Sequence, residues 1–271
     1  MTRCKNCNKQ FNGKYCNNCG QKKYSDADKD FLSIFKEIFH FLTHFEGTFF
    51  TTLKAIYLHP AKLSCDYCEG IRKKYFKPVS FYFLIVALYL LFPIFQGLNT
   101  SLQFQKKMFA GELISKQIEH KIRTKNMTED QFSEKYTHYS EKVSKILLFL
   151  FIPFSGFLIY FLFYKQKKLA FDLTIYSTEI NIFFITTFFL FFPVLFLLFH
   201  KVFTHILPSE KLTVIIVEVA FILYLSIFFR RIFQNKWGLI FFKSMVFAFL
   251  HMVFLLTIYR FLLFEISYFF I

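Results

Sequence analysis

The chain lacks the short motifs that mark common catalytic sites. It has no GxSxG turn, no HExxH helix and no Gly-rich phosphate loop, and only 8 of its 271 residues are glycine. No two carboxylates lie at the close spacing of an acid–base pair. These absences exclude the familiar motif-based enzymes, although membrane enzymes often use dispersed residues. The first residues also lack the apolar stretch of a signal peptide, so we expect a mature N-terminus.

Apolar residues, in contrast, are abundant. The chain is 55% hydrophobic and 23% aromatic, contains 45 Phe and has a mean hydropathy of +0.40. These residues cluster in long uncharged runs, which predicts an all-α polytopic membrane protein. Five runs are long enough to cross a bilayer: Val79–Leu98, Ile146–Tyr164, Ile182–Phe203, Leu212–Phe229 and Leu239–Phe264.

Basic residues predict the orientation of these spans. The net charge is +15, and 14 Lys and Arg precede the first span. The turns with Lys165, Lys167 and Lys168 and with Arg230, Arg231 and Lys236 should lie on the same side. The positive-inside rule places this side in the cytoplasm and, with five spans, the C-terminus on the opposite side, which in a bacterial inner membrane is the periplasm. The charge suits anionic headgroups better than nucleic acid, because it is scattered along segments that flank the membrane.

Six cysteines form three CxxC pairs. Cys4, Cys7, Cys16 and Cys19 lie on either side of an Asn12-Gly13 turn, a spacing that predicts a zinc ribbon over residues 1–24. Four thiolates leave no open position for bound water, so the predicted zinc is structural. Iron–sulfur or redox chemistry is the alternative. The third pair, Cys65 and Cys68, needs further ligands such as His40, His44 or His59, and we favour two ordinary thiols.

Residues 25–78 are expected to form amphipathic juxtamembrane helices. Apolar residues recur at helical spacing from Phe31 to Phe45, Gly47 is a break, and Pro60 a stop. These helices either lie in the membrane interface or pack beneath the spans. Residues 79–271 form the predicted transmembrane domain.

An extracytoplasmic loop at 99–144 is expected to contain two helices, near Leu102–Arg123 and Glu129–Lys145. Thr128 and Gln131 fit a capping box at the start of the second helix. Its mixed charges favour a solvated face over a docking surface.

Few ionisable residues fall within the predicted spans. Lys243 and Arg260 lie toward the ends of the fifth and can snorkel. Glu218 and His251 need a different account, because charge in hydrocarbon is costly. A hydrogen bond between them is possible, as helix–helix glue or as part of a proton path, and we favour glue.

Two stretches resemble a known family. The chain is similar to domain-of-unknown-function family 3667, an uncharacterised family of Bacteroidetes-type membrane proteins. The similar stretches are CKNCNKQFNGKYCNNCGQ and, after it, GTFFTTLKAIYLHPAKLSCDYCEGIRKKYFKPVSFYFL. The resemblance implies an N-terminal CxxC ribbon, a Phe- and Thr-rich stretch, and a Tyr-x-x-Gly-x-Arg-Lys-x-Tyr element before the spans. This element corresponds to Tyr67, Gly70, Arg72, Lys73 and Tyr75. The family implies no activity.

The leading hypothesis from the sequence is a non-enzymatic scaffold or accessory subunit. Its zinc ribbon and juxtamembrane region would bind a membrane or cytoplasmic protein, with partner or headgroup contacts from Tyr67, Gly70, Arg72, Lys73, Lys74 and Tyr75. Alternatives are a small-solute or ion transporter using Glu218 and His251, and a membrane enzyme acting on a lipid or lipid-linked substrate through Arg72, Tyr75, His59 and Asp172.

Overall fold

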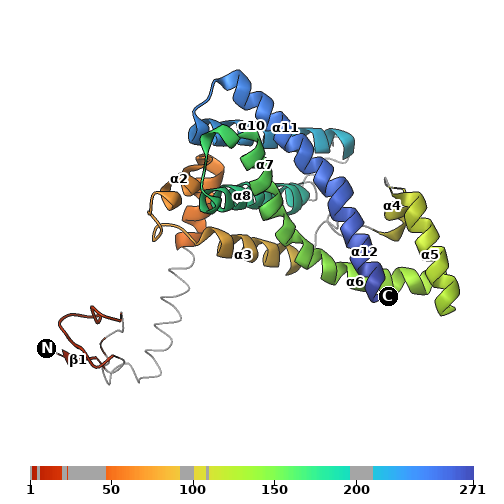
Figure 1. Ribbon diagram of the computed structural model, residues 1–271, viewed down its shortest axis with the longest axis horizontal. Coiled ribbons are helices and arrows are strands. Elements are labelled where there is room, and N and C mark those ends of the chain that lie inside the picture. Colours follow the sequence, from red (N-terminus) through yellow and green to blue (C-terminus); the bar gives the residue numbers. More distant parts are fainter. Residues whose placement is uncertain are drawn as a thin grey trace. The chain divides into compact units, whose positions relative to one another are not determined.

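The computed structural model divides the chain into two compact units, Met1–Phe50 and Thr51–Ile271 (Figure 1). The structure describes residues 2–4, 7–19, 23, 47–91, 101–107, 110–195 and 210–271. The predicted amphipathic stretch from Phe31 to Phe45 lies outside the described residues.

The first unit contains a small two-stranded ribbon. Strands β1 (Thr2–Arg3) and β2 (Gln10–Phe11) pair antiparallel, with Thr2 opposite Phe11. The chain turns back between them through Asn8, whose φ of 59° is left-handed and suits an asparagine. The buried residues are Cys4, Phe11 and Cys16, with Cys7 packed against them. So small a core cannot by itself stabilise the ribbon.

The second unit is helical. Its first residues, 51–58, are helical, and this helix ends just before Pro60, as predicted. The helices that follow are α2 (Lys62–Cys68), α3 (Pro78–Leu91), α4 (Leu102–Lys106), α5 (Gly111–Lys125), α6 (Glu129–Leu147), η2 (Leu148–Leu150), α7 (Phe151–Leu162), η3 (Tyr164–Gln166), α8 (Ala170–Ile185), η4 (Thr186–Phe191), α10 (Glu210–Phe233), α11 (Trp237–Phe254), η5 (Leu255–Tyr259) and α12 (Arg260–Phe270). Two of these, η4 and η5, are π-helices.

Three continuous helices of the described chain are long and apolar enough to cross a membrane: Glu129–Leu162, Ala170–Leu195 and Trp237–Phe270. They identify the chain as a membrane protein and account for three of the five predicted spans. The first predicted span coincides with α3 in a shorter form, Pro78–Tyr89, and the fourth lies within α10. Those two spans stay predictions.

Helix α8 is the central helix of the described bundle. Every residue from Ile175 to Ile185 is buried, and α2, α3 and α7 all pack against it (Figure 1). A helix enclosed on all sides can carry polar residues, because neighbouring protein supplies their hydrogen-bond partners. The predicted span began only at Ile182, so it missed the polar first half of this helix.

The predicted loop helices are present with one difference. The expected helix Leu102–Arg123 is divided into α4 and α5, and Gly111 marks the division. A Cβ atom on Gly111 would lie 2.0 Å from the Lys106 carbonyl oxygen, so this close approach requires glycine. The second helix begins with the predicted capping box: the Thr128 hydroxyl accepts from the Gln131 N–H, and the Gln131 side chain accepts from the Thr128 N–H.

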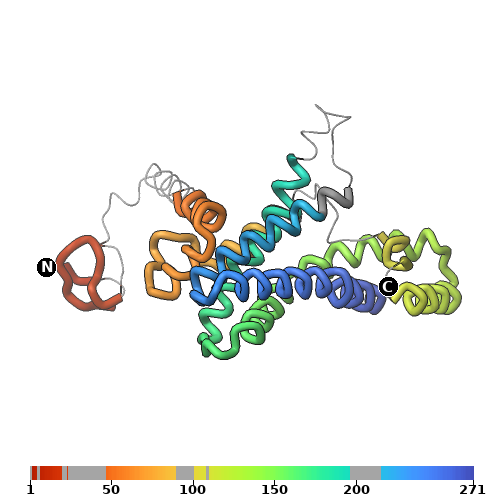
Figure 2. The backbone as a smooth tube through the Cα atoms, turned by 90° about the horizontal axis from the view of Figure 1, so that it is seen from above, coloured from red at the N-terminus to blue at the C-terminus, as the bar shows by residue number. Residues whose placement is uncertain are grey.

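These loop helices pack against the C-terminal helix. Figures 1 and 2 both show α12 beside α6. One hydrophobic cluster joins α4, α5, α6 and α12, with Ile118, Phe132, Tyr136 and Phe264 at its centre. The hairpin is therefore continuous with the span bundle.

Candidate functional site

The four N-terminal cysteines converge at one end of the ribbon. Their sulfur atoms all lie within 4.8 Å of one another. Cys4 Sγ lies 3.5 Å from Cys19 Sγ, and Cys7 Sγ lies 3.6 Å from Cys16 Sγ. The turn after Cys4 is closed by the Asn8 N–H, which donates to the Cys4 carbonyl at 2.9 Å. The four side chains thus form a compact group that could hold one metal ion.

The geometry and chemistry of this group fit a tetrahedral thiolate site. A zinc ion about 2.3 Å from each sulfur would place the sulfurs about 3.8 Å apart, close to the two distances observed. The N–H groups of Cys19 and Asn18 lower the pKa of the Cys16 thiol, which favours a thiolate. The Lys9 N–H acts to lower the pKa of Cys7, but burial and the three nearby thiols outweigh it and raise the value to about 11. A bound cation would displace such protons.

The third cysteine pair lies in a different setting. Cys65 and Cys68 are half-buried in α2 and belong to no group of three or more potential metal ligands among the described residues. Burial, followed by a hydrogen bond to Asp172, raises the pKa of Cys68 to about 12. Burial and the nearby Glu179 raise the pKa of Cys65. Thiols held in the protonated form are poor ligands and poor nucleophiles.

The segment Tyr67–Tyr75 folds back on α2. Gly70, at φ 98°, ends the helix in a conformation that favours glycine, and the Ile71 N–H donates to the Asp66 carbonyl at 2.8 Å. The Arg72 guanidinium lies 5.3 Å from the Tyr67 ring and 5.4 Å from the Phe171 ring. Tyr67 and Arg72 therefore contact the protein itself, while Lys73 is exposed.

Asp66 joins the two ends of this segment. The buried Tyr75 hydroxyl donates to Asp66 Oδ2 at 2.5 Å, and Lys62 and Lys74 lie 3.3 and 4.0 Å from the same oxygen. Burial acts to raise the pKa of Asp66. The hydrogen bonds from Tyr75 and Lys62 and the charges of Lys62 and Lys74 outweigh it and hold the pKa below its ordinary value. Asp66 is thus an ionised acceptor, and its contacts with Tyr75 and Lys74 hold the turn against α2.

A buried carboxylate on α8 holds the start of α2. Glu179 is 0% exposed, and its Oε1 accepts from the Ala61 N–H at 2.9 Å. Its Oε2 accepts from the Ser64 N–H at 2.8 Å and from the Ser64 hydroxyl at 2.5 Å. Ala61 has no side chain that can cap α2, so Glu179 takes that role from 115 to 118 residues away. The sequence interpretation missed this residue.

His251 is paired with Asn181 rather than with Glu218. The Asn181 Nδ2 donates to the carbonyls of Phe151 and Ser177 at 3.1 and 2.8 Å, so its Oδ1 faces His251 Nε2 at 3.1 Å. The Nε2 of His251 must therefore carry the hydrogen. His251 Nδ1 and Glu218 Oε2 each have no hydrogen-bond partner in the part of the chain that the structure describes. The hydrogen bond between Glu218 and His251, considered possible from the sequence, is not among the contacts of the described residues.

His251 lies among aromatic rings. Phe184 is the nearest, with ring centroids 4.5 Å apart, and Phe151 lies at 5.4 Å. Enclosure by rings explains why its Nδ1 finds no donor. The His251–Asn181 hydrogen bond is an interhelical contact between α11 and α8. The glue role considered in the sequence analysis was that of a different pair, Glu218 and His251.

Arg260 and Lys243 also differ from the prediction that both snorkel. Lys243 reaches the end of α7, where its ammonium donates to the Leu162 carbonyl. Arg260 is only 8% exposed, and its guanidinium lies 4.6 Å from the Phe104 ring. Packing of α4 over the start of α12 covers it.

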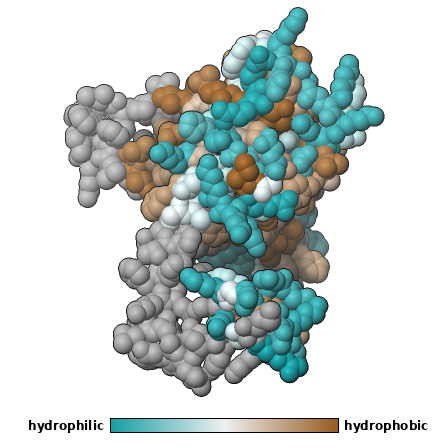
Figure 3. Space-filling model, turned by 90° about the vertical axis from the view of Figure 1, so that its left-hand side faces the viewer, coloured by the Kyte–Doolittle hydropathy of each residue, from teal (hydrophilic) through white to brown (hydrophobic). Residues whose placement is uncertain are grey.

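The basic segments predicted to share one side do lie together in the second unit. Gln166, in the turn between α7 and α8, donates to the Phe233 carbonyl and to Asn235 at 3.1 and 3.2 Å. Arg231 donates to the carbonyls of His59 and Pro60. Hydrophilic side chains cover much of the face shown in Figure 3. Both turns thus flank the start of α2, whichever side of the membrane they occupy.

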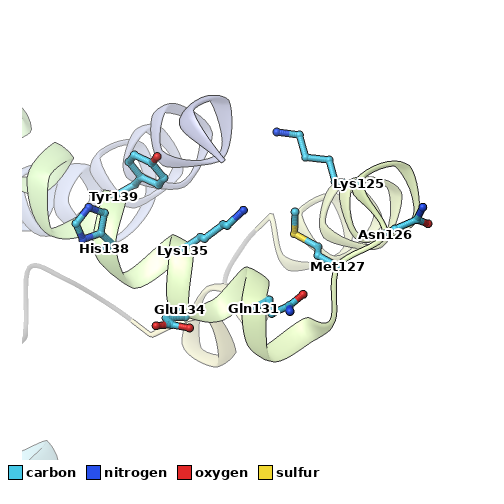
Figure 4. A pocket seen from close by; sticks show the side chains of 8 residues that line it. All are labelled: Lys125, Asn126, Met127, Gln131, Glu134, Lys135, His138 and Tyr139. Carbon is cyan, nitrogen blue, oxygen red and sulfur yellow. The ribbon is translucent and has the colours of Figure 1, made fainter.

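A polar pocket lies on the hairpin. Lys125 and Met127 line one side, at the end of α5 and in the loop after it, and Lys135, His138 and Tyr139 line the other from α6 (Figure 4). Its charged side chains are exposed. This is the solvated surface expected from the mixed charges.

The residues of the lipid-enzyme alternative have separate partners. Tyr75 is held by Asp66, and Arg72 lies against Tyr67 and Phe171. Asp172 is hydrogen-bonded to the Cys68 thiol. The backbone carbonyl of His59 accepts a hydrogen bond from Arg231. None of these contacts brings the four residues together in one catalytic group.

Comparison with known proteins supports the resemblance in part of the chain. Residues 46–90 match the family model described as Protein of unknown function (DUF3667). No curated protein and no solved structure matches the chain. The DUF3667 segment contains the helix 47–58, α2, the Tyr67–Tyr75 turn and all of α3 except Leu91. Glu179, which caps α2, lies outside it.

Proposed function

We propose that the protein is a non-enzymatic scaffold or accessory subunit of a bacterial inner membrane, with a zinc ribbon on the cytoplasmic side that binds another protein. One observation carries the proposal: four cysteine sulfurs lie within 4.8 Å of one another and supply all the ligands of a tetrahedral site. A closed thiolate site stabilises a fold and leaves no position for substrate. A ribbon without a substrate position can act only through the side chains on its surface. We therefore propose that these side chains bind another protein.

The contacts of the second unit support a static role for the DUF3667 segment. Glu179 and Asn181, two polar residues deep in the bundle, are engaged by protein groups on several sides. The transporter alternative relied on Glu218 and His251 acting together, and they are not bonded to each other. The contacts of α2 and of the Tyr67–Tyr75 turn thus favour a fixed structural part of the second unit over a moving one.

Affinity purification of the full-length protein from gently solubilised membranes tests the proposal. We expect one set of proteins to co-purify with the wild type and to be lost with Cys4→Ser, while Cys65→Ser retains it. Zinc measured in the same samples should be present, lost and present, respectively. Equal recovery of the same proteins with Cys4→Ser would contradict a binding role for the ribbon.

The side of the membrane is tested separately. With the ribbon in the cytoplasm, a membrane-impermeant maleimide should label a cysteine introduced at Lys73 only after the cells are opened. Labelling in intact cells would place this end of the bundle outside the cytoplasm and would contradict the predicted orientation.

A further inference from the structure

The Tyr67–Tyr75 turn lies at the level where a membrane span begins. The continuous helix Ala170–Leu195 is one of the described spans, and Phe171 is its second residue. The Phe171 ring stacks on the Tyr67 ring with 6.4 Å between centroids, and it lies 5.4 Å from the Arg72 guanidinium. These contacts place the turn beside the first residues of a span, which is where lipid headgroups meet a membrane protein.

The other two described spans have an end at the same level. The helix Glu129–Leu162 ends just before the turn that contains Gln166, and Trp237–Phe270 begins two residues after Asn235. The Gln166 amide donates to the Asn235 side chain at 3.2 Å, so these two span ends are neighbours. The Tyr67–Tyr75 turn therefore belongs to the boundary of the membrane and not to a part of the protein remote from lipid.

The exposed side chains at this boundary are cationic and apolar. Arg72 and Lys73 are exposed, and neither forms an ion pair with a described residue. Ile71, directly before them, is 48% exposed, and Leu169, directly before the span, is 70% exposed. Figure 3 shows hydrophobic side chains between hydrophilic ones on this face of the second unit. Such a mixture is typical of the boundary between headgroups and acyl chains.

Arg72 is positioned by the protein and still open to an anion. Its guanidinium lies 5.3 Å from the Tyr67 ring and 5.4 Å from the Phe171 ring. A guanidinium that contacts ring faces keeps the N–H donors at its edge for oxygen acceptors. Lys74 differs, because its ammonium lies 4.0 Å from Asp66, and it is not part of the site.

We propose that the Tyr67–Tyr75 turn is a binding site for an anionic phospholipid. Arg72 and Lys73 contact the headgroup phosphate, because planar guanidinium donors match phosphate oxygens. Ile71 lies against the first part of an acyl chain. The charge of the site selects an anionic over a zwitterionic lipid, and its place at the end of a span selects lipid over a soluble protein. The site rests on the membrane spans and is independent of the ribbon and its metal.

Native mass spectrometry of the full-length protein tests the headgroup. The protein is exchanged into phosphatidylglycerol or phosphatidylcholine at equal concentration, and we expect about tenfold more retention of phosphatidylglycerol. The double variant Arg72→Gln, Lys73→Gln should remove most of this preference. The matched control, Arg123→Gln with Lys135→Gln, makes the same change in charge at exposed residues of α5 and α6 and should keep it. Glu69→Gln, which removes the one carboxylate between Tyr67 and Tyr75, should strengthen it.

Fluorescence tests the acyl-chain contact. The chain has a single tryptophan, so Trp237→Phe gives a background in which a new one can be followed. Ile71→Trp should be quenched by phosphatidylcholine brominated on its acyl chains close to the headgroup. Lys116→Trp, at a side chain that is 72% exposed on α5, is the control and should keep its fluorescence.

Three results would overturn the site: equal retention of the two phospholipids, the same loss of preference in both double variants, or Ile71→Trp fluorescence that brominated lipid leaves unchanged. If the Arg72→Gln, Lys73→Gln variant fails to fold, Lys73→Gln alone carries the test and should reduce the preference to about threefold. Loss of co-purifying proteins in the double variant, with unchanged lipid retention, would assign the turn to a protein partner. Cys4→Ser should keep the lipid preference, which separates this site from the role proposed for the ribbon.

Discussion

The N-terminal ribbon and the helical unit differ in the distance along the chain that separates the side chains in contact. In the ribbon, Cys4 and Cys19 are 15 residues apart. In the helical unit, Glu179 meets Ala61 across 118 residues, and Asn181 meets His251 across 70. The first kind of contact is visible as a spacing in the sequence. The second depends on which helices are neighbours, and this information is absent from any local pattern.

The largest effect should come from removing the metal that we propose for the ribbon. A chelator, or Cys16→Ser, should unfold the first unit, because metal binding contributes about 10 kcal/mol or more to such small modules. Limited proteolysis should then cut within the first 50 residues while the helical unit keeps its melting temperature. Cys68→Ser is the control and should retain the metal. A protease-resistant ribbon without metal would show that the ribbon folds by other means.

Next in size is the loss of Glu179. Glu179→Ala leaves the buried N–H groups of Ala61 and Ser64 without an acceptor, and each should cost about 1–3 kcal/mol. We expect a total destabilisation of about 3 kcal/mol in detergent unfolding. Glu218→Gln is the matched control, since Glu218 Oε2 has no partner among the described residues, and should change stability by less than about 0.5 kcal/mol. Equal effects of the two changes would refute the capping role.

Asn181→Ala should have a smaller effect, about 2 kcal/mol, because it leaves His251 Nε2–H without an acceptor in an apolar environment. Thermal unfolding of the purified protein measures it. The double variant Asn181→Ala, His251→Phe removes both partners and should recover part of the loss. If the double variant loses as much stability as the Asn181→Ala and His251→Phe single variants added together, the two residues do not act as a pair.

Asp66 should give the smallest effect, about 1 kcal/mol, with a defined pH dependence. Its folded pKa is below the ordinary value of 3.8, so its stabilisation is present above that value and is lost as the pH falls through the lower folded value. Unfolding from pH 7 to pH 3 should show the advantage of wild type over Asp66→Asn shrinking at the acid end. A constant difference across this range would show that Asp66 does not act through its charge.

Much of the fold could be predicted from the sequence. The cysteine spacing, the Thr128 capping box, the stop at Pro60 and the clustering of basic turns all depend on local patterns, and the structure contains each of them. The third span was drawn too short because Asp172, Glu179 and Asn181 lower the hydropathy of α8. An average of hydropathy along the sequence cannot distinguish polar residues that contact other helices from polar residues that contact water.

The Glu218–His251 hydrogen bond, considered possible from the sequence, is not among the described contacts for a related reason. Both were chosen as ionisable residues within spans, but the neutral Asn181 was outside that search and is the actual partner of His251. Arg260 was expected to snorkel because it lies toward a helix end. In the structure, Phe104 of α4 covers the Arg260 guanidinium. Helix α4 lies far from Arg260 in the sequence, since Gln105 and Arg260 are separated by 155 residues.

X-ray absorption spectroscopy of the purified full-length protein tests the central claim most directly. The account predicts one zinc per chain with four sulfur neighbours at about 2.3 Å, and loss of this signal in Cys16→Ser but not in Cys68→Ser. A metal with nitrogen or oxygen neighbours, or a protein that is folded and metal-free as isolated without chelators, would contradict it.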